Sequence, residues 1–292
     1  MLNGCITALV TPMFEDEAVD FESLDNLVEW QIENGVIGLV ANGSTGEAAN
    51  LSTKETIDVI ERIIAKAAGR VKIIVGAGTA STATSLKFLE RVNEINGIDY
   101  IMCLTPYYVK PTQEGLYRHF GLMAEKSKHP VILYNVPGRT GCDIHDSTIL
   151  RLANDYKNIV GLKDATGDIP RLVSFMVDKP KDFILLSGDD CTVLPFISSG
   201  GNGVISVVSN IRPRHMSDLC AFIHANKREA AIELNSKLVK LYDSCFWEAN
   251  PIPVKWALYH ENRMPTPTLR MPLTTFSECY HDAMSKLLQL TK

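Results

Sequence analysis

The chain has 292 residues, of which 46% are hydrophobic and 22% are charged, and its formal net charge at pH 7 is -5. This balance is typical of an ordinary globular enzyme and excludes a disordered or fibrous chain. Because neither charge sign forms a long run, binding to nucleic acid or to an anionic membrane surface is also excluded. No apolar stretch reaches the ~18 residues that a membrane span needs, so we expect a cytoplasmic protein.

Eight short apolar runs alternate with helical patterns for most of the chain, as in a parallel sheet covered by helices. They cover residues 6–10, 38–41, 72–76, 100–104, 131–135, 159–163, 183–187 and 203–207. Eight runs predict an α/β fold of the (β/α)8 TIM-barrel type. A doubly wound open sheet is the alternative, but a Thr-Pro-Met segment at 11–13 stands where its glycine-rich phosphate loop would follow the first strand.

Helical signals are clearest at Ser52, which is followed three residues later by Glu55 in a capping box. In that helix Ile57, Ile60 and Ile64 are expected to face the barrel. After residue 221 the strand signals stop, and helical patterns over 228–246 and 277–290 follow, joined through proline-rich stretches at 251–253 and 265–272. We therefore predict a catalytic barrel over residues 1–224 and a C-terminal helical domain over residues 225–292.

Signals for metals and organic cofactors are weak throughout the sequence. The seven cysteines form no C-x-x-C pair, and the histidines never approach an H-E-x-x-H spacing. The acidic pair at 189–190 lacks partners and is more typical of a structural role, and the segment 76–78 lacks the third glycine of a dinucleotide-binding motif. We predict that no metal ion and no cofactor is required.

Lys163 is the most informative residue among the polar segments that end five predicted strands, at the edge where barrel enzymes place their active sites. It ends the apolar run 159–162, and burial there would disfavour its charged form and lower its pKa. A neutral amine attacks a ketone and gives an iminium, an electron sink that lets a neighbouring methyl group lose a proton. The structural alternative is a lysine that snorkels or pairs with a carboxylate.

Other strand ends supply groups that suit the same chemistry. Tyr134 ends the preceding strand, where it can move protons, although a core tyrosine with a satisfied hydroxyl is the alternative. Ser44 and Thr45 follow the second strand between two glycines, and they can bind a carboxylate, relay a proton or simply form a turn. Arg139 can clamp a substrate carboxylate with two hydrogen bonds, or it can form a surface ion pair.

Several motifs, in order and over essentially the whole chain, give a family resemblance. They are 8–12, 43–47 (GSTGE), 134–141 (YNVPGRTG), 161–167 (GLKDATG), 201–205 and 250–256. Together they resemble the pyruvate-dependent class I aldolase family that contains dihydrodipicolinate synthase and N-acetylneuraminate lyase. The resemblance implies that Lys163 forms an imine with pyruvate, while Ser44, Tyr134 and Tyr108 form a proton relay. Tyr108 would come from the neighbouring subunit of a homotetramer built as a dimer of dimers.

The same resemblance implies a substrate pocket. Thr45 would hold the pyruvate carboxylate, the backbone at Gly188 and Ile205 would line the pocket, and Arg139 would receive the carboxylate of aspartate semialdehyde. Arg139 followed by threonine and glycine is similar to the synthases, which make 4-hydroxy-tetrahydrodipicolinate, a precursor of diaminopimelate and lysine. Ser44 departs from the threonine of many synthases, and related lyases also carry serine.

Two other functions stay open at this stage. One is an N-acetylneuraminate or 2-keto-3-deoxy sugar-acid lyase that uses the same pyruvate imine. The other is a barrel without catalysis that binds a small keto acid, against which the intact Lys163, Tyr134 and Tyr108 argue.

The resemblance also bears on inhibition by lysine. Lysine-inhibited members of the family carry His, Asn and Glu at the positions where this chain has Thr53, Thr56, Ala80 and Thr84, and only Tyr107 is retained. We therefore expect weak or absent inhibition by lysine.

Overall fold

The structure is a computed structural model, and it describes residues 2–292. Eight parallel strands form a closed barrel in the order β1 to β8, which confirms the predicted fold class. The strands are β1 Gly4–Ala8, β2 Gly38–Ala41, β3 Lys72–Gly76, β4 Tyr100–Leu104, β5 Val131–Asn135, β6 Ile159–Asp164, β7 Ile184–Ser187 and β8 Gly203–Ser206. Every residue of β1, β2, β5, β7 and β8 is buried, because parallel strands covered by helices are apolar on both faces.

The α-helices follow the strands in chain order. They are α1 Phe21–Glu33, α2 Thr53–Ala67, α3 Thr82–Val92, α4 Gln113–Lys126, α5 Pro137–Thr140, α6 Asp146–Asp155, α7 Ile169–Asp178, α8 Val193–Ser198, α9 Pro213–His224, α10 Arg228–Ser244, α11 Ile252–His260 and α12 His281–Leu290. The proline-rich stretch at 251–253 was expected to be only a connection, and this expectation was wrong. It begins α11, because proline fits the first turn of a helix, where no intrahelical donor is needed.

The predicted capping box at the start of α2 is present, with both the Ser52 and the Glu55 hydrogen bonds made. The expected inward stripe was partly wrong, since Ile57 and Ile64 are only half-buried. The buried residues of α2 are Thr56, Val59, Ile60, Ile63 and Ala67. At two of the three predicted positions the buried residue is therefore the one before the isoleucine, Thr56 in place of Ile57 and Ile63 in place of Ile64.

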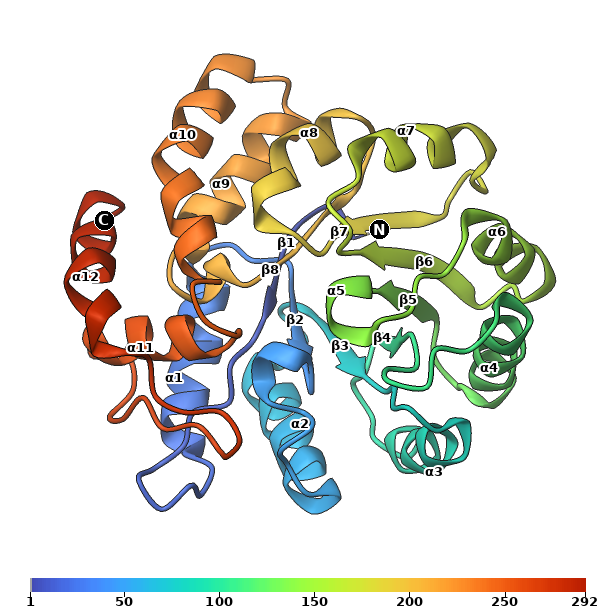
Figure 1. The fold of residues 1–292 in the computed structure, drawn as a ribbon, viewed down its shortest axis with the longest axis horizontal. Helices are drawn as coiled ribbons and strands as arrows, with labels where there is room; N and C mark the ends of the chain where they lie inside the picture. Colours follow the sequence, from blue (N-terminus) through green and yellow to red (C-terminus); the bar gives the residue numbers. More distant parts are fainter. Residues whose placement is uncertain (1) are drawn as a thin grey trace. The chain divides into compact units, whose positions relative to one another are not determined.

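Two compact units make up the chain. The first contains residues 2–3 and Lys72–Ile205, and the second contains Gly4–Val71 and Ser206–Lys292. In the first unit α3, α4 and α6 pack in succession outside their strands (Figure 1). In the second unit α1 packs against α2, α9 against α10, and α12 against α10 and α11 (Figure 1). The boundary between residues 224 and 225 stays a prediction. Within residues 2–292, no helix is both long and apolar enough to cross a membrane.

Candidate active site

Lys163 and Tyr134 lie side by side at the ends of neighbouring strands of the first unit. They are direct partners in the β5–β6 register, and the Lys163 Nζ lies 4.1 Å from the centroid of the Tyr134 ring. Both side chains are buried, with exposed fractions of 6% and 7%. Since partners in a parallel pair point to the same face of the sheet, the amine and the phenol share one small space.

Burial is the main influence on the Lys163 amine, and it lowers the pKa of this group to about 7. The negative charge of Asp190 raises that pKa, and the positive charge of Arg139 lowers it. No carboxylate in the described part of the chain lies within ion-pair distance of the Lys163 amine. The sequence-based alternative of a lysine paired with a carboxylate is therefore wrong. A large share of Lys163 is the neutral, nucleophilic amine near pH 7.

Gly188 leaves room for the Lys163 side chain. A Cβ atom at this position would lie 2.9 Å from the Lys163 Cε and 2.7 Å from the Ala165 Cβ, which is closer than packed atoms approach. The Gly188 N–H also donates to the Asp164 carbonyl at 2.7 Å, which fixes the chain after β7 against β6. Ile205 lies on β8 and is buried, and its contribution to a pocket stays a prediction.

Arg139, on a short helix, and Tyr108, on the loop between β4 and α4, are exposed residues of the same unit. Arg139 belongs to α5 and is exposed, yet its charge acts on Lys163. The Tyr108 side chain is 89% exposed, and its φ of 72° is unfavourable for a residue with a large side chain. Its N–H donates to the Thr140 carbonyl at 3.1 Å, so α5, which also bears Arg139, holds this strained backbone in place.

A polar network lies directly behind Tyr134 and Lys163, because the next residue on each strand points to the opposite face. The Asn135 Nδ2 donates to the Asp143 carboxylate at 2.7 Å and to the Asp164 carboxylate at 3.3 Å. The Thr166 hydroxyl donates to Asp164 at 2.6 Å. Burial raises the pKa of Asp164, against the lowering effects of the Thr166 hydrogen bond and the Arg171 charge.

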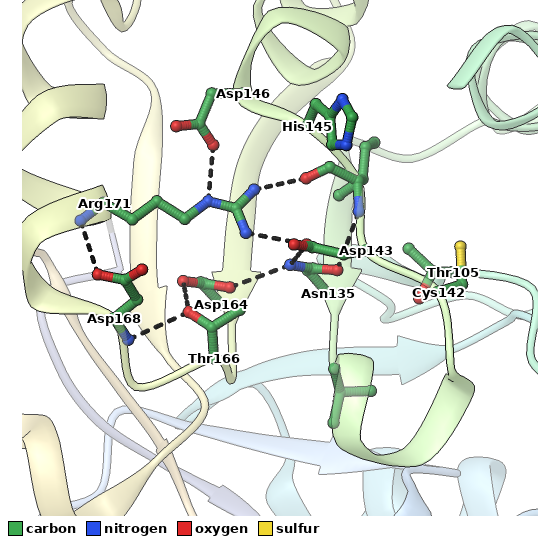
Figure 2. A network of polar contacts seen from close by, with 12 residues as sticks. Thr105, Asn135, Cys142, Asp143, His145, Asp146, Asp164, Thr166, Asp168 and Arg171 are labelled. Atoms are coloured by element: carbon green, nitrogen blue, oxygen red, sulfur yellow. Dashed lines mark hydrogen bonds and ion pairs between the residues drawn. The ribbon is translucent and has the colours of Figure 1, made fainter. Parts of the chain in front are cut away.

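Arg171 of α7 completes this network (Figure 2). Its guanidinium donates to Asp143 at 2.9 Å and to Asp146 at 2.7 Å, and it also binds the Ile144 carbonyl. Figure 2 shows the guanidinium pointing into the loop between β5 and α6, and the same loop begins with the segment that bears Arg139. The network therefore ties the ends of β5 and β6 and the loop between β5 and α6 to one helix, α7.

Ser44 and Thr45 lie in the second unit, on a short 3₁₀ helix over Ser44–Gly46 that follows β2. Thr45 is buried, and its hydroxyl accepts a hydrogen bond of 2.9 Å from the Asn250 Nδ2. The Thr11 hydroxyl donates to the Gly46 carbonyl at 2.8 Å, which closes the turn from the β1 side. The joint action of Ser44 and Thr45 with Lys163 stays a prediction.

Glu47 follows this turn with a left-handed backbone at φ 57° and a fully buried carboxylate. It forms an ion pair of 2.7 Å with Lys255 of α11, whose side chain is also fully buried. The second carboxylate oxygen of Glu47 accepts from the backbone N–H of Arg270 at 3.1 Å. Burial lowers the pKa of Lys255, while the Glu47 charge and hydrogen bond raise it.

Sequence reasoning gave Asn250 and Lys255 no role, and it gave Asp190 only a structural one. The segment 250–256 contributed to the family resemblance, but its polar residues were given no role. Asp189 does act structurally, because its carboxylate accepts a hydrogen bond of 3.1 Å from the Cys191 N–H, whereas the charge of Asp190 raises the pKa of Lys163.

In the described range of 2–292, no group of three or more His, Cys, Asp or Glu side chains is arranged to hold a metal ion.

Comparisons with known proteins agree on one family. The model of the dihydrodipicolinate synthetase family matches residues 1–291. A 4-hydroxy-tetrahydrodipicolinate synthase of Laribacter hongkongensis is 49% identical over 278 residues, which cover 95% of this chain and 94% of that protein. A synthase of the same name from Coxiella burnetii is 44% identical over 289 residues, which cover 99% and 98% of the two chains.

Solved structures of the same kind superpose closely on this chain. The chloride-inhibited dihydrodipicolinate synthase of Acinetobacter baumannii, complexed with pyruvate, is 44% identical with a TM-score of 0.96, covering 100% of this chain and 99% of that one. The enzyme of Cyanidioschyzon merolae with lysine bound is 32% identical with a TM-score of 0.94, covering 99% and 98%.

Proposed function

Because the chain belongs to the dihydrodipicolinate synthetase family, we propose that it condenses pyruvate with L-aspartate 4-semialdehyde to give 4-hydroxy-tetrahydrodipicolinate. The observation that carries the chemistry is the buried amine of Lys163, with a pKa of about 7 and the Tyr134 ring beside it. The product belongs to diaminopimelate and lysine biosynthesis, and the enzyme acts in the cytoplasm without a cofactor.

The reaction begins at the neutral Lys163 amine, which attacks the ketone carbon of pyruvate. Loss of water from the resulting carbinolamine gives an iminium, and the adjacent methyl group then releases a proton to form an enamine. The enamine carbon attacks the aldehyde carbon of the second substrate, and one carbon–carbon bond forms. Hydrolysis or ring closure by the substrate amine releases Lys163. Tyr134, Ser44 and Tyr108 move the protons in these steps.

Two carboxylates must be held during this sequence. Thr45 holds the pyruvate carboxylate, with the backbone at Gly188 and Ile205 lining the same pocket. Arg139 receives the carboxylate of aspartate semialdehyde, which a guanidinium binds with two parallel hydrogen bonds. The exposure of Arg139 and the electrostatic effect of its charge on the Lys163 amine support this role.

Tyr108 acts from the neighbouring subunit of a homotetramer, a dimer of dimers. An aromatic ring that is 89% exposed on a strained backbone supports this exchange, because such strain persists where a structure uses it. Tyr108→Phe should reduce turnover and leave formation of the pyruvate imine partly intact. Turnover at the wild-type rate in this variant would contradict the exchange, and sedimentation velocity measures the assembly independently.

Lysine inhibits this enzyme weakly or not at all. Thr53, Thr56, Ala80 and Thr84 offer no charged side chain to a lysine ligand, and Thr56 is buried. A steady-state assay with added lysine tests this, and inhibition at micromolar lysine would contradict it.

The purified protein tests the whole proposal in a coupled assay. Pyruvate and aspartate semialdehyde are supplied, and the product is followed through its reductase by NADPH oxidation. Turnover that is abolished in Lys163→Ala supports the synthase. Absence of turnover with intact borohydride trapping of pyruvate would instead indicate an N-acetylneuraminate or sugar-acid lyase, and failure of trapping would indicate a binding protein.

A further inference from the structure

The turn that bears Ser44 and Thr45 is held by three groups more than 200 residues away in the sequence. Asn250 donates to the Thr45 hydroxyl, Lys255 pairs with Glu47, and the Arg270 backbone binds the same carboxylate. Of these three contacts, only the one from Asn250 reaches a group to which the proposed function gives a substrate contact.

The direction of this hydrogen bond decides what Thr45 can do. A carboxamide Nδ2 can only donate, so the Thr45 Oγ1 is the acceptor, and the hydroxyl keeps its own proton for another partner. A carboxylate such as that of pyruvate can only accept. Both Asn250 and Thr45 are buried, with exposed fractions of 6% and 3%, so bulk water does not readily take the place of either partner.

We propose that Asn250 is a positioning residue that orients the Thr45 hydroxyl as a hydrogen-bond donor toward the carboxylate of pyruvate. This inference rests on the proposed function of Thr45. The buried Glu47–Lys255 pair fixes the backbone of the turn, and Asn250 fixes the hydroxyl rotor. The two effects are separable, since a rotor effect acts on pyruvate alone, whereas a distorted turn also lowers stability.

Two substitutions at position 250 test the direction of the bond. Asn250→Asp is almost the same size, but a carboxylate can only accept, so it would capture the Thr45 proton and repel the substrate carboxylate. We expect the pyruvate KM to rise by about tenfold or more, as for loss of a hydrogen bond to a charged group. Asn250→Ala leaves the Thr45 hydroxyl free to rotate and should raise the pyruvate KM by roughly three- to tenfold. We expect kcat and the KM for aspartate semialdehyde to stay within about twofold of the wild-type values.

A double-mutant cycle separates positioning from a general structural role. Thr45→Val removes the hydroxyl and keeps the shape of the side chain. In that background Asn250→Ala should change the pyruvate concentration that half-saturates borohydride trapping by less than about twofold, because the group it orients is gone. An equal loss in both backgrounds would overturn the proposal, as would wild-type pyruvate binding by Asn250→Asp.

Asn93→Ala is the matched control, since the Asn93 carboxamide also donates a hydrogen bond, to the Lys126 carbonyl, at a position with no proposed role in the reaction. It should trap pyruvate like the wild type. If the wild-type protein itself traps no pyruvate, the proposed function fails and this inference falls with it. If the wild type traps pyruvate and the Asn250 variants match it, only the positioning role of Asn250 is overturned.

Discussion

Lys163 and Lys255 are two buried lysines with opposite partners. Lys255 is fully buried and lies 2.7 Å from the Glu47 carboxylate, whereas Lys163 has the Tyr134 ring beside it and, within residues 2–292, no carboxylate at ion-pair distance. Burial lowers the pKa of both amines, and Glu47 counteracts that effect at Lys255. Burial therefore favours the neutral amine at Lys163, whereas at Lys255 the fold supplies a carboxylate that favours the cation.

The largest expected difference between the two lysines concerns turnover. Lys163→Met removes the proposed nucleophile and should reduce kcat by roughly a thousandfold or more, because no imine could then form. Lys255→Met should keep measurable activity per folded molecule, since this side chain takes no part in the reaction. The coupled assay at equal concentrations of folded protein compares them. Comparable residual activity in the two variants would contradict the assignment of Lys163, and not Lys255, as the reacting amine.

Stability should respond in the opposite way. Lys255→Met leaves the Glu47 carboxylate buried and unpaired, and we expect the free energy of unfolding to fall by about 3–5 kcal/mol. Adding Glu47→Gln removes the unpaired charge and should restore part of this loss. Urea unfolding followed by circular dichroism measures both variants. If Lys255→Met alone is as stable as the wild type, the Glu47–Lys255 ion pair does not hold the turn.

Lys163→Met should stabilise the protein near and below pH 7, by about 1–4 kcal/mol, because burial disfavours the charged form of this amine and the apolar side chain removes that cost. In the unfolded chain this lysine keeps its ordinary pKa of 10.5, whereas the folded pKa is about 7, so the folded state binds the proton more weakly. The increase in the free energy of unfolding that Lys163→Met causes is therefore full below about pH 7, and it shrinks as the pH rises toward 10.5. Urea unfolding at pH 6.5 and pH 9.5 tests this trend, and a gain that grows with pH would contradict the sign.

The smallest effect concerns pH and imine formation in the wild type. The rate of pyruvate imine formation should rise about tenfold per pH unit below pH 7 and level off above it, because only the neutral amine attacks. Stopped-flow mixing followed by borohydride quenching measures this rate. A profile that still rises at pH 9 would show that the Lys163 amine keeps the ordinary pKa of an exposed lysine.

The sequence predicted the strands and the burial of Lys163 because their signals are local. The strands β2 to β5 match the predicted apolar runs to the residue, and Lys163 ends such a run. The first strand was predicted two residues too late, since the apolar run continues to Val10, where the Asn210 side chain binds the backbone N–H. That hydrogen bond joins positions 200 residues apart, and no local pattern reveals it.

The supporting groups of the candidate site could not be predicted for the same reason. Glu47 and Lys255 are 208 residues apart, and Thr45 and Asn250 are 205 apart, so only the closed fold makes them partners. Local sequence indicates that a lysine is buried, but the presence or absence of its carboxylate partner is a tertiary property. The chemical difference between the two lysines therefore became visible only in the structure.

The most direct test of this account is to treat the wild-type protein with pyruvate and borohydride and to map the adduct by peptide mass spectrometry. We predict a single reduced pyruvate adduct on the peptide that contains Lys163, with Lys255 unmodified in the same sample. An adduct on Lys255 or elsewhere with Lys163 intact, or no adduct at saturating pyruvate, would contradict the claim that Lys163 is the activated amine.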